Sequence, residues 1–282
     1  MSTEIAVSEL ADLHTHTYYS DGLYSPEEIF RRVAEAGLGA VAITDHDTLD
    51  GCRNASSLAG SQPFEFVVGV ELSCAGKGRG EIHMLGYFLD LDNADLNEHM
   101  ERFRDVREER ARQIHEKLGT LGYKVDFELI KAEAGRAAIA RPHIARVLQE
   151  MGIVSSYNEA FARFLGEGSP ACAPKEEFPP EEAIKLIKGA GGIAVIAHPG
   201  LGVETRDIWN LKKAGAEGLE VYHPIHSDKQ KKYYYAVARQ YGMIPTGGSD
   251  YHGSKDYESG ILGKIGVYKT VVRQLRDRAN AS

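Results

Sequence analysis

The sequence predicts an α/β protein built on a parallel sheet or barrel, because short apolar runs alternate with helical patterns at both ends of the chain. A length of 282 residues suits one large domain, or one domain that carries an insertion. The apolar runs that predict strands end at 14 or cover 40–44, 66–72, 81–87, 192–197, 218–222 and 243–246.

Helix-start signals separate these predicted strands. Ser25 is followed by Pro26 and two glutamates, which is the pattern of an N-cap, a proline at the first helical position and an acidic first turn. Further helices are expected over 50–60, from 180 onward and over 229–241. The resulting order of strand, helix and strand is that of an α/β domain.

The region from 97 to 177 has a different pattern. Its first part contains five arginines between Arg102 and Arg112, interleaved with glutamates as in a solvated helix with ion pairs. Helical patterns continue over 142–150 and 157–165. We therefore expect a helical insertion over 97–177 between two halves of one domain, 1–96 and 178–282.

Composition narrows the class of protein. Hydrophobic residues make up 43% and charged residues 26%, and the 33 Lys and Arg against 41 Asp and Glu give a net charge of −8. A protein that coats nucleic acid usually has the opposite balance. The three cysteines provide neither a disulfide framework nor a zinc ribbon. With no visible signal peptide or membrane span, a cytoplasmic location is expected.

Most histidines outside the insertion lie near the ends of predicted strands. The carboxyl ends of parallel strands converge on one face of a barrel, so side chains placed there can meet. His83 lies within the run 81–87. The other candidates at strand ends are His14, His16, His46, Glu71, His198, His223, Asp250 and His252.

These residue types favour a catalytic metal centre. His14-Thr15-His16 places two imidazoles on the same face of a strand, because side chains alternate with a period of two. Asp45-His46-Asp47 and Asp250-Tyr251-His252 combine imidazole with carboxylate. Such ligands suit Zn, Mn or Fe(II), and the absence of cysteine near them favours a catalytic over a structural site.

The same residues resemble the motifs of the PHP (polymerase and histidinol phosphatase) family. The motifs are Asp12-Leu13-His14-Thr15-His16 with Ser20-Asp21-Gly22, Thr44-Asp45-His46-Asp47-Thr48, Gly69-Val70-Glu71, Ala197-His198-Pro199 and Gly248-Ser249-Asp250-Tyr251-His252-Gly253. The resemblance implies a distorted (β/α)7 barrel with up to three metals at the carboxyl ends of its strands. The insertion 97–177 would then be a helical cap over the active site.

The resemblance also implies a ligand set, and hence a cofactor of two or three divalent transition-metal ions (Mn, Fe or Zn). Asp21 stands where other members have histidine, which resembles the subgroup that hydrolyses small phosphate esters and nucleotides. By position, the sets are His14, His16, Glu71 and Asp250 for one metal, His46, His252 and Asp21 for a second, and Glu71, His83 and His198 for a third, with Glu71 bridging.

The insertion carries candidate substrate contacts. Arg141-Pro142-His143-Ile144-Ala145 and Ala173-Pro174-Lys175 resemble motifs in the cap of that subgroup. An arginine offers phosphate a bidentate fork and a lysine offers a compact charge, so Arg141 and Lys175 are expected to bind phosphate. The alternative is that Arg141 and Lys175 are surface charges without a role in substrate binding. His226 is a third candidate, although His223 and His226 could equally hydrogen-bond to metal ligands.

The expected activity is metal-dependent hydrolysis of small phosphate esters, such as nucleoside phosphates, 3′,5′-bisphosphates or sugar (cyclic) phosphates. A metal-bridging hydroxide would attack phosphorus in line, with Asp250 or His198 managing protons. One alternative is an exoribonuclease or oligonucleotide phosphodiesterase that acts at the 5′ ends of short RNA. Two others are an amidohydrolase-type enzyme that cleaves C–N bonds and a non-catalytic metal-binding module.

Overall fold

The computed structural model describes residues 9–75, 81–253 and 261–281. The chain divides into two compact units, one formed by Met1–Glu98 and Glu177–Ser282 and the other by His99–Glu176. None of the helices in the described ranges is long and apolar enough to cross a membrane.

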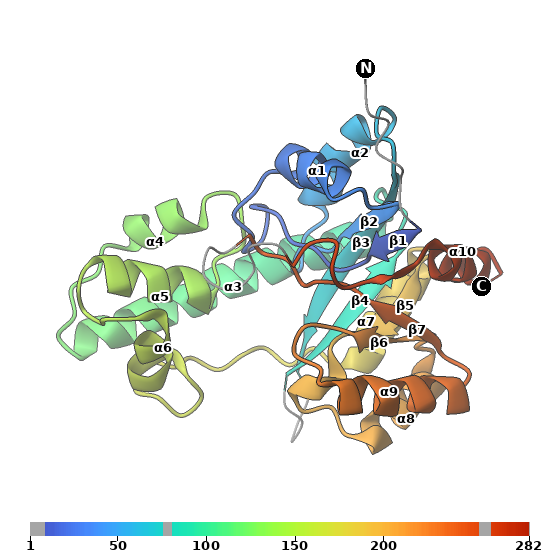
Figure 1. The fold of residues 1–282 in the computed structure, drawn as a ribbon. Coiled ribbons are helices and arrows are strands. Elements are labelled where there is room, and N and C mark those ends of the chain that lie inside the picture. Colours follow the sequence, from blue (N-terminus) through green and yellow to red (C-terminus); the bar gives the residue numbers. More distant parts are fainter. Residues whose placement is uncertain (1–8, 76–80, 254–260, 282) are drawn as a thin grey trace. The chain divides into compact units, whose positions relative to one another are not determined.

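An eight-stranded sheet forms the frame of the first unit, in the spatial order β7-β6-β5-β4-β3-β2-β1-β8 (Figure 1). The strands β1 to β3 pair in parallel, as do β5 to β7, whereas β4 runs antiparallel to both β3 and β5. The parallel pairs agree with the prediction of a parallel sheet or barrel, and β4 is an exception that the sequence did not show. The strands are β1 Leu10–Asp12, β2 Ala40–Ile43, β3 Glu65–Cys74, β4 Ile82–Tyr87, β5 Ile193–Ile196, β6 Gly218–Tyr222, β7 Ile244–Gly247 and β8 Val267–Tyr268.

Backbone hydrogen bonds join β1 to β7 and close the sheet into a barrel. The N–H of Leu13 donates to the carbonyl of Gly247 at 3.3 Å, and the N–H of His16 donates to that of Tyr251 at 2.9 Å. Gly248 permits this approach, since a Cβ there would lie 2.4 Å from the backbone nitrogen of His14. The predicted distorted barrel of seven strands is therefore confirmed, and β8 extends it by pairing antiparallel with β1.

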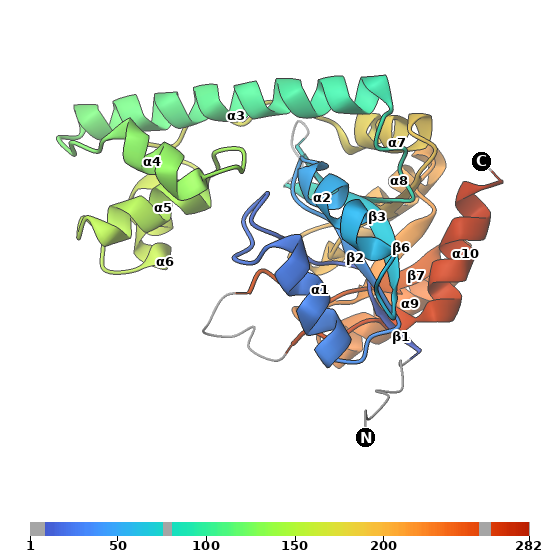
Figure 2. The ribbon, with the colours of Figure 1, turned by 90° about the horizontal axis from the view of Figure 1, so that it is seen from above.

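Helices surround the barrel. They are α1 Pro26–Glu35, α2 Asp50–Ala59, α7 Pro180–Gly189, α8 Thr205–Ala214, α9 Asp228–Gln240 and α10 Lys269–Ala279. Helices α1, α2, α7 and α9 lie where the sequence predicts helices, whereas α8 and α10 were not predicted. As predicted, the Ser25 side chain caps α1 by accepting the N–H of Glu28. Helix α10 packs Val272 and Leu275 into an apolar cluster with strand residues of the barrel (Figure 2).

The second unit is helical and has its own core. Its elements are the greater part of α3 Ala94–Thr120, then α4 Phe127–Ala134, α5 Arg141–Glu150, α6 Tyr157–Ala160 and a π-helix Phe161–Leu165. Ile114 of α3 and Leu148 of α5 belong to one buried apolar cluster. Side chains of α3 also fix the segment after the π-helix, because Arg110 donates to the Ala173 carbonyl at 3.1 Å.

Candidate metal centre

The nine side chains predicted to bind metal come together at the end of the barrel where the parallel strands finish. His83 lies near the start of β4, which reaches this end because β4 is antiparallel to its neighbours. The loops after β1, β2, β5 and β7 supply seven others, His14, His16, Asp21, His46, His198, Asp250 and His252, and β3 supplies Glu71.

Glu71 stands at the centre of this cluster and is fully buried. Burial by itself raises its pKa, but the imidazoles of His46, His14 and His83 outweigh burial and hold the pKa well below its usual range. Its Oε2 lies 3.1 Å from His14 Nε2, 3.3 Å from His16 Nε2 and 3.3 Å from His46 Nδ1, and its Oε1 lies 2.8 Å from His83 Nδ1 and 2.9 Å from His198 Nε2. Each carboxylate oxygen therefore faces a different set of imidazoles.

A first ligand group consists of His14, His16, Glu71 and Asp250, whose ligand atoms all lie within 4.8 Å of one another. Asp250 Oδ1 lies 3.0 Å from His16 Nε2 and 3.2 Å from His14 Nε2. Asp250 has a φ of +53°, a left-handed conformation that is uncommon outside glycine and that recurs at functional sites. This is the set that the sequence predicts for one metal.

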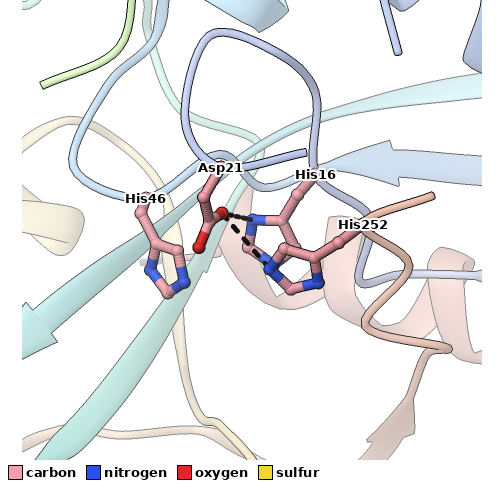
Figure 3. Close-up of side chains that lie close together, drawn as sticks. All are labelled: His16, Asp21, His46 and His252. Carbon is pink, nitrogen blue, oxygen red and sulfur yellow. Dashed lines mark ion pairs between the residues drawn. The ribbon is translucent and has the colours of Figure 1, made fainter. Parts of the chain in front are cut away.

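Figure 3 shows the second group, His16, Asp21, His46 and His252. Asp21 Oδ1 lies 3.2 Å from His252 Nε2 and 3.9 Å from His16 Nδ1 (Figure 3). His16 Nδ1, Asp21 Oδ1 and His46 Nδ1 are buried without a hydrogen bond. Buried polar atoms that lack a hydrogen bond are destabilising, and a divalent cation would give all three a partner. The donor set therefore fits a transition-metal ion.

A third group consists of His46, Glu71 and His83. His198 contacts the same Glu71 oxygen as His83, so it adjoins this group as the resemblance implies. The first and second groups share His16, the first and third share Glu71, and the second and third share His46. Ions held in these groups would therefore lie close enough to act as one centre.

Asp45 supports the loop that carries Asp21. Its carboxylate accepts the backbone N–H of Thr17 at 2.7 Å, the Thr17 hydroxyl at 2.7 Å and the Ser20 hydroxyl at 2.6 Å. Asp47 likewise accepts the N–H of Ser73 at 2.8 Å. Among the described residues, His46 is the one member of the Asp45-His46-Asp47 motif that belongs to a ligand group. The carboxylates of Asp45 and Asp47 instead hydrogen-bond to neighbouring loops and strands.

Glu220 of β6 is a buried carboxylate that the sequence analysis missed. Its Oε1 lies 3.0 Å from His14 Nδ1, and its Oε2 accepts the backbone N–H of His198 at 2.8 Å. A carboxylate at Nδ1 fixes the tautomer and orientation of His14, so that Nε2 faces Glu71 and Asp250. Burial acts to raise the pKa of Glu220, but the imidazoles of His14, His223 and His198 outweigh it and lower the pKa. The signal that could have identified Glu220 is its position as the only charged residue in an apolar predicted strand, because a buried glutamate usually has a partner.

Both ring nitrogens of His226 have partners within the protein, and its predicted contact with phosphate stays a prediction. His226 is 2% exposed, its Nδ1 donates to the Val221 carbonyl at 2.8 Å, and its Nε2 accepts the Gly200 N–H at 3.1 Å. Burial lowers the pKa of His226, so the ring is a neutral link between two loops. His223, by contrast, lies with Nε2 3.3 Å from Asp250 Oδ2 and is placed to support that ligand.

Arg141 and Lys175 lie in the second unit, and both are half-buried. The Arg141 guanidinium donates to the Leu165 carbonyl at 3.4 Å and lies 5.7 Å from the centre of the Phe161 ring. Lys175 lies two residues after the Ala173 carbonyl that Arg110 holds. Their contact with substrate phosphate stays a prediction.

Comparison with known proteins agrees with this geometry. Residues 12–165 match the family model described as PHP domain. The chain is 34% identical to a 5′-3′ exoribonuclease of Haemophilus influenzae, over 86% of this chain and 89% of the relative. It is 33% identical to a 3′,5′-nucleoside bisphosphate phosphatase of Chromobacterium violaceum, over 86% of both chains.

A solved structure gives the same result. A Bifidobacterium adolescentis protein assigned as a metal-dependent phosphoesterase superposes with a TM-score of 0.86 and 28% identity, over 95% of this chain and 96% of that chain. The family match covers more than half of the chain, and the predicted resemblance is confirmed. The chain therefore belongs to the PHP domain family, and it is a metal-dependent phosphoesterase.

Proposed function

We propose that this chain hydrolyses the phosphate esters of small metabolites, with nucleoside 3′,5′-bisphosphates as the leading substrate class and sugar (cyclic) phosphates as close alternatives. The observation that carries the proposal is the single buried centre in which three ligand groups share Glu71, His16 or His46. The relative from Chromobacterium violaceum is named for activity on such bisphosphates, which supports this choice.

The metal ions are proposed to be two or three, of Mn, Fe or Zn, held by His14, His16, Asp21, His46, Glu71, His83, His198, Asp250 and His252. Such ions lower the pKa of a bound water and neutralise charge on phosphoryl oxygens. Asp250 is the member of the first group whose side chain keeps the most exposed surface, 26% against 0–1% for its neighbours. We therefore propose that Asp250, as a carboxylate, manages the proton of the attacking water, with His198 as the second candidate.

We further propose that the helical region 97–177 is a cap that selects substrate through Arg141 and Lys175. The cap has its own core, and Arg102 pairs with Glu176 at 2.7 Å, next to Lys175. A bisphosphate carries one phosphate for the metal ions and a second for a guanidinium or ammonium group.

The second candidate function is removal of nucleotides from the 5′ end of short RNA. The exoribonuclease relative favours it, and it requires the same attack on phosphorus. The relatives named as phosphatase and exoribonuclease favour phosphate esters over C–N bonds, and the complete ligand groups favour an enzyme over a non-catalytic module. A cytoplasmic location is compatible with the three free cysteines.

The test compares a nucleoside 3′,5′-bisphosphate, a short 5′-phosphorylated RNA and a closed circular RNA, with ring amides as the C–N control. We expect rapid release of phosphate from the bisphosphate, slower shortening of the RNA from its end, and no cleavage of the circle or the amides. Efficient cleavage of the circular RNA would contradict an enclosed site, and hydrolysis of amides alone would overturn the proposal.

A further inference from the structure

A second surface of the barrel lies where α8 and α9 run side by side (Figure 1). We call it the α8–α9 seam and define it by Trp209, Lys213, Lys229, Tyr233 and Tyr241. We infer that the seam binds single-stranded RNA that extends away from the metal centre. This inference rests on the proposed function, because it concerns nucleotides joined to the one that reacts.

Exposed aromatic side chains gather on this surface. Six large apolar side chains are at least 39% exposed among the described residues of the first unit, and two of them, Trp209 and Tyr233, belong to the seam. The rings of Trp209 and Tyr241 lie 4.9 Å apart across the two helices, and the Tyr233 hydroxyl hydrogen-bonds with that of Thr205. Trp209 and Tyr233 nevertheless keep 43% and 46% of their surface exposed. Exposed rings held by neighbours are suited to stack on bases.

The local charge is opposite to that of the whole chain. Residues 204–241 hold seven Lys and Arg against five Asp and Glu, whereas the chain holds 33 against 41. Two of those five acids, Glu217 and Glu220, are buried. Lys213 lies with Nζ 5.8 Å from the centre of the Trp209 ring, and Lys229 comes one helical turn before Tyr233. Cations beside exposed rings fit a phosphate backbone with its bases, which favours RNA over an uncharged partner.

A series of side-chain contacts joins the seam to the metal centre. His223 contacts the ligand Asp250 at 3.3 Å. From His223 the ring centres follow at 5.6 Å to His226, 4.9 Å to Tyr234 and 5.3 Å to Tyr233. These rings are buried between His223 and Tyr234, so the series shows that Tyr233 lies within the length of a few nucleotides of the metal centre, and the RNA would follow the surface.

The length of the seam sets the number of nucleotides that it can hold. From Thr205 to Lys213, α8 advances about 12 Å at about 1.5 Å per residue. At about 3.4 Å per stacked nucleotide, this holds roughly three or four nucleotides. Affinity should therefore rise over the first few nucleotides and then level off.

Trp209 is the only tryptophan of the chain, so its fluorescence reports directly on the seam. The probe is a 5′-phosphorylated hexauridylate with phosphorothioate linkages, which resists hydrolysis. We expect saturable quenching that weakens with salt, and no quenching by a nucleoside 3′,5′-bisphosphate. The inference is overturned if the RNA leaves the fluorescence unchanged, if the bisphosphate quenches equally, or if only phosphatidylserine vesicles cause a response.

Variants locate the effect. Tyr233→Ala and Lys213→Glu should each raise KM for cleavable hexauridylate roughly fivefold or more, and leave hydrolysis of the bisphosphate unchanged. Tyr268→Ala and Lys264→Glu are matched controls, because both residues are exposed and lie outside the seam. An enzyme that lacks bisphosphatase activity would refute the proposed function. An active bisphosphatase whose KM for RNA is insensitive to length, or to the seam variants, would refute only the seam.

Discussion

The metal centre and the helical unit 99–176 use polar side chains in opposite ways. In the metal centre, imidazoles and carboxylates from distant parts of the sequence contact one another, and their side chains are between 0% and 26% exposed. In the helical unit, Arg110 and Arg141 donate to backbone carbonyls of their own unit. The difference teaches that polar side chains of the barrel contact one another and form the metal centre, whereas these two arginines bind the backbone of the helical unit. Changes in the two regions should therefore have separable effects.

The largest effect is expected for Glu71→Gln. The substitution keeps the shape of the side chain but removes the charge that faces five imidazoles. Activity should fall by more than about a hundredfold, beyond the range typical of residues that only orient a ligand. Metal content, measured by elemental analysis, should fall with it, and further than for any single histidine variant. Glu35→Gln, on an exposed helix position, is the control. Full metal content in Glu71→Gln would contradict the proposal that Glu71 holds the metal ions.

Glu220→Gln should have the next largest effect. The amide cannot hold His14 Nδ1 as a carboxylate does, so affinity for metal should fall about tenfold to a hundredfold. Because Glu220 acts through His14, excess metal should restore most of kcat while KM for substrate stays unchanged. Equilibrium metal titration measures the shift. An unchanged metal affinity would assign Glu220 to folding alone.

Arg141→Ala and Lys175→Ala test whether the helical unit contributes to phosphate binding. Both variants should keep their metals, because neither residue is a metal ligand in the proposal. Loss of a charged hydrogen bond to phosphate is worth about 1.5–3 kcal/mol, so kcat/KM should fall roughly tenfold to a hundredfold. Arg146→Ala is the matched control, because Arg146 lies on the same helix and pairs with Glu133 at 3.0 Å. Wild-type kinetics in both variants would remove the helical unit from phosphate binding.

The smallest effect on catalysis is expected for His226→Ala. KM for a bisphosphate should stay within about twofold, because both ring nitrogens are used within the protein. The free energy of unfolding should instead fall by about 1–3 kcal/mol, since the Gly200 N–H loses its partner. Denaturant unfolding and steady-state kinetics measure the two effects. A tenfold rise in KM at unchanged stability would identify His226 as a phosphate contact.

Local patterns predicted the strands, several helices and a cluster of imidazoles and carboxylates, whereas the resemblance to the PHP family implied the seven-stranded barrel and the three ligand sets. His14-Thr15-His16 fixes two ligands by the period of a strand, and Ser25 with Pro26 fixes the start of a helix. The antiparallel direction of β4 was not predictable, since an apolar run has no signature of its direction. Glu220 and His226 depend on partners far away in the sequence, which a motif cannot show.

The most direct test of the account is a stepwise return of metal to chelated protein, with hydrolysis of a nucleoside 3′,5′-bisphosphate followed at each step. If one centre around Glu71 performs the chemistry, activity should be absent without metal and should return as two or three ions bind per chain. Mn, Fe(II) and Zn should be tested separately. Undiminished hydrolysis by protein that elemental analysis shows to be free of metal would contradict the account.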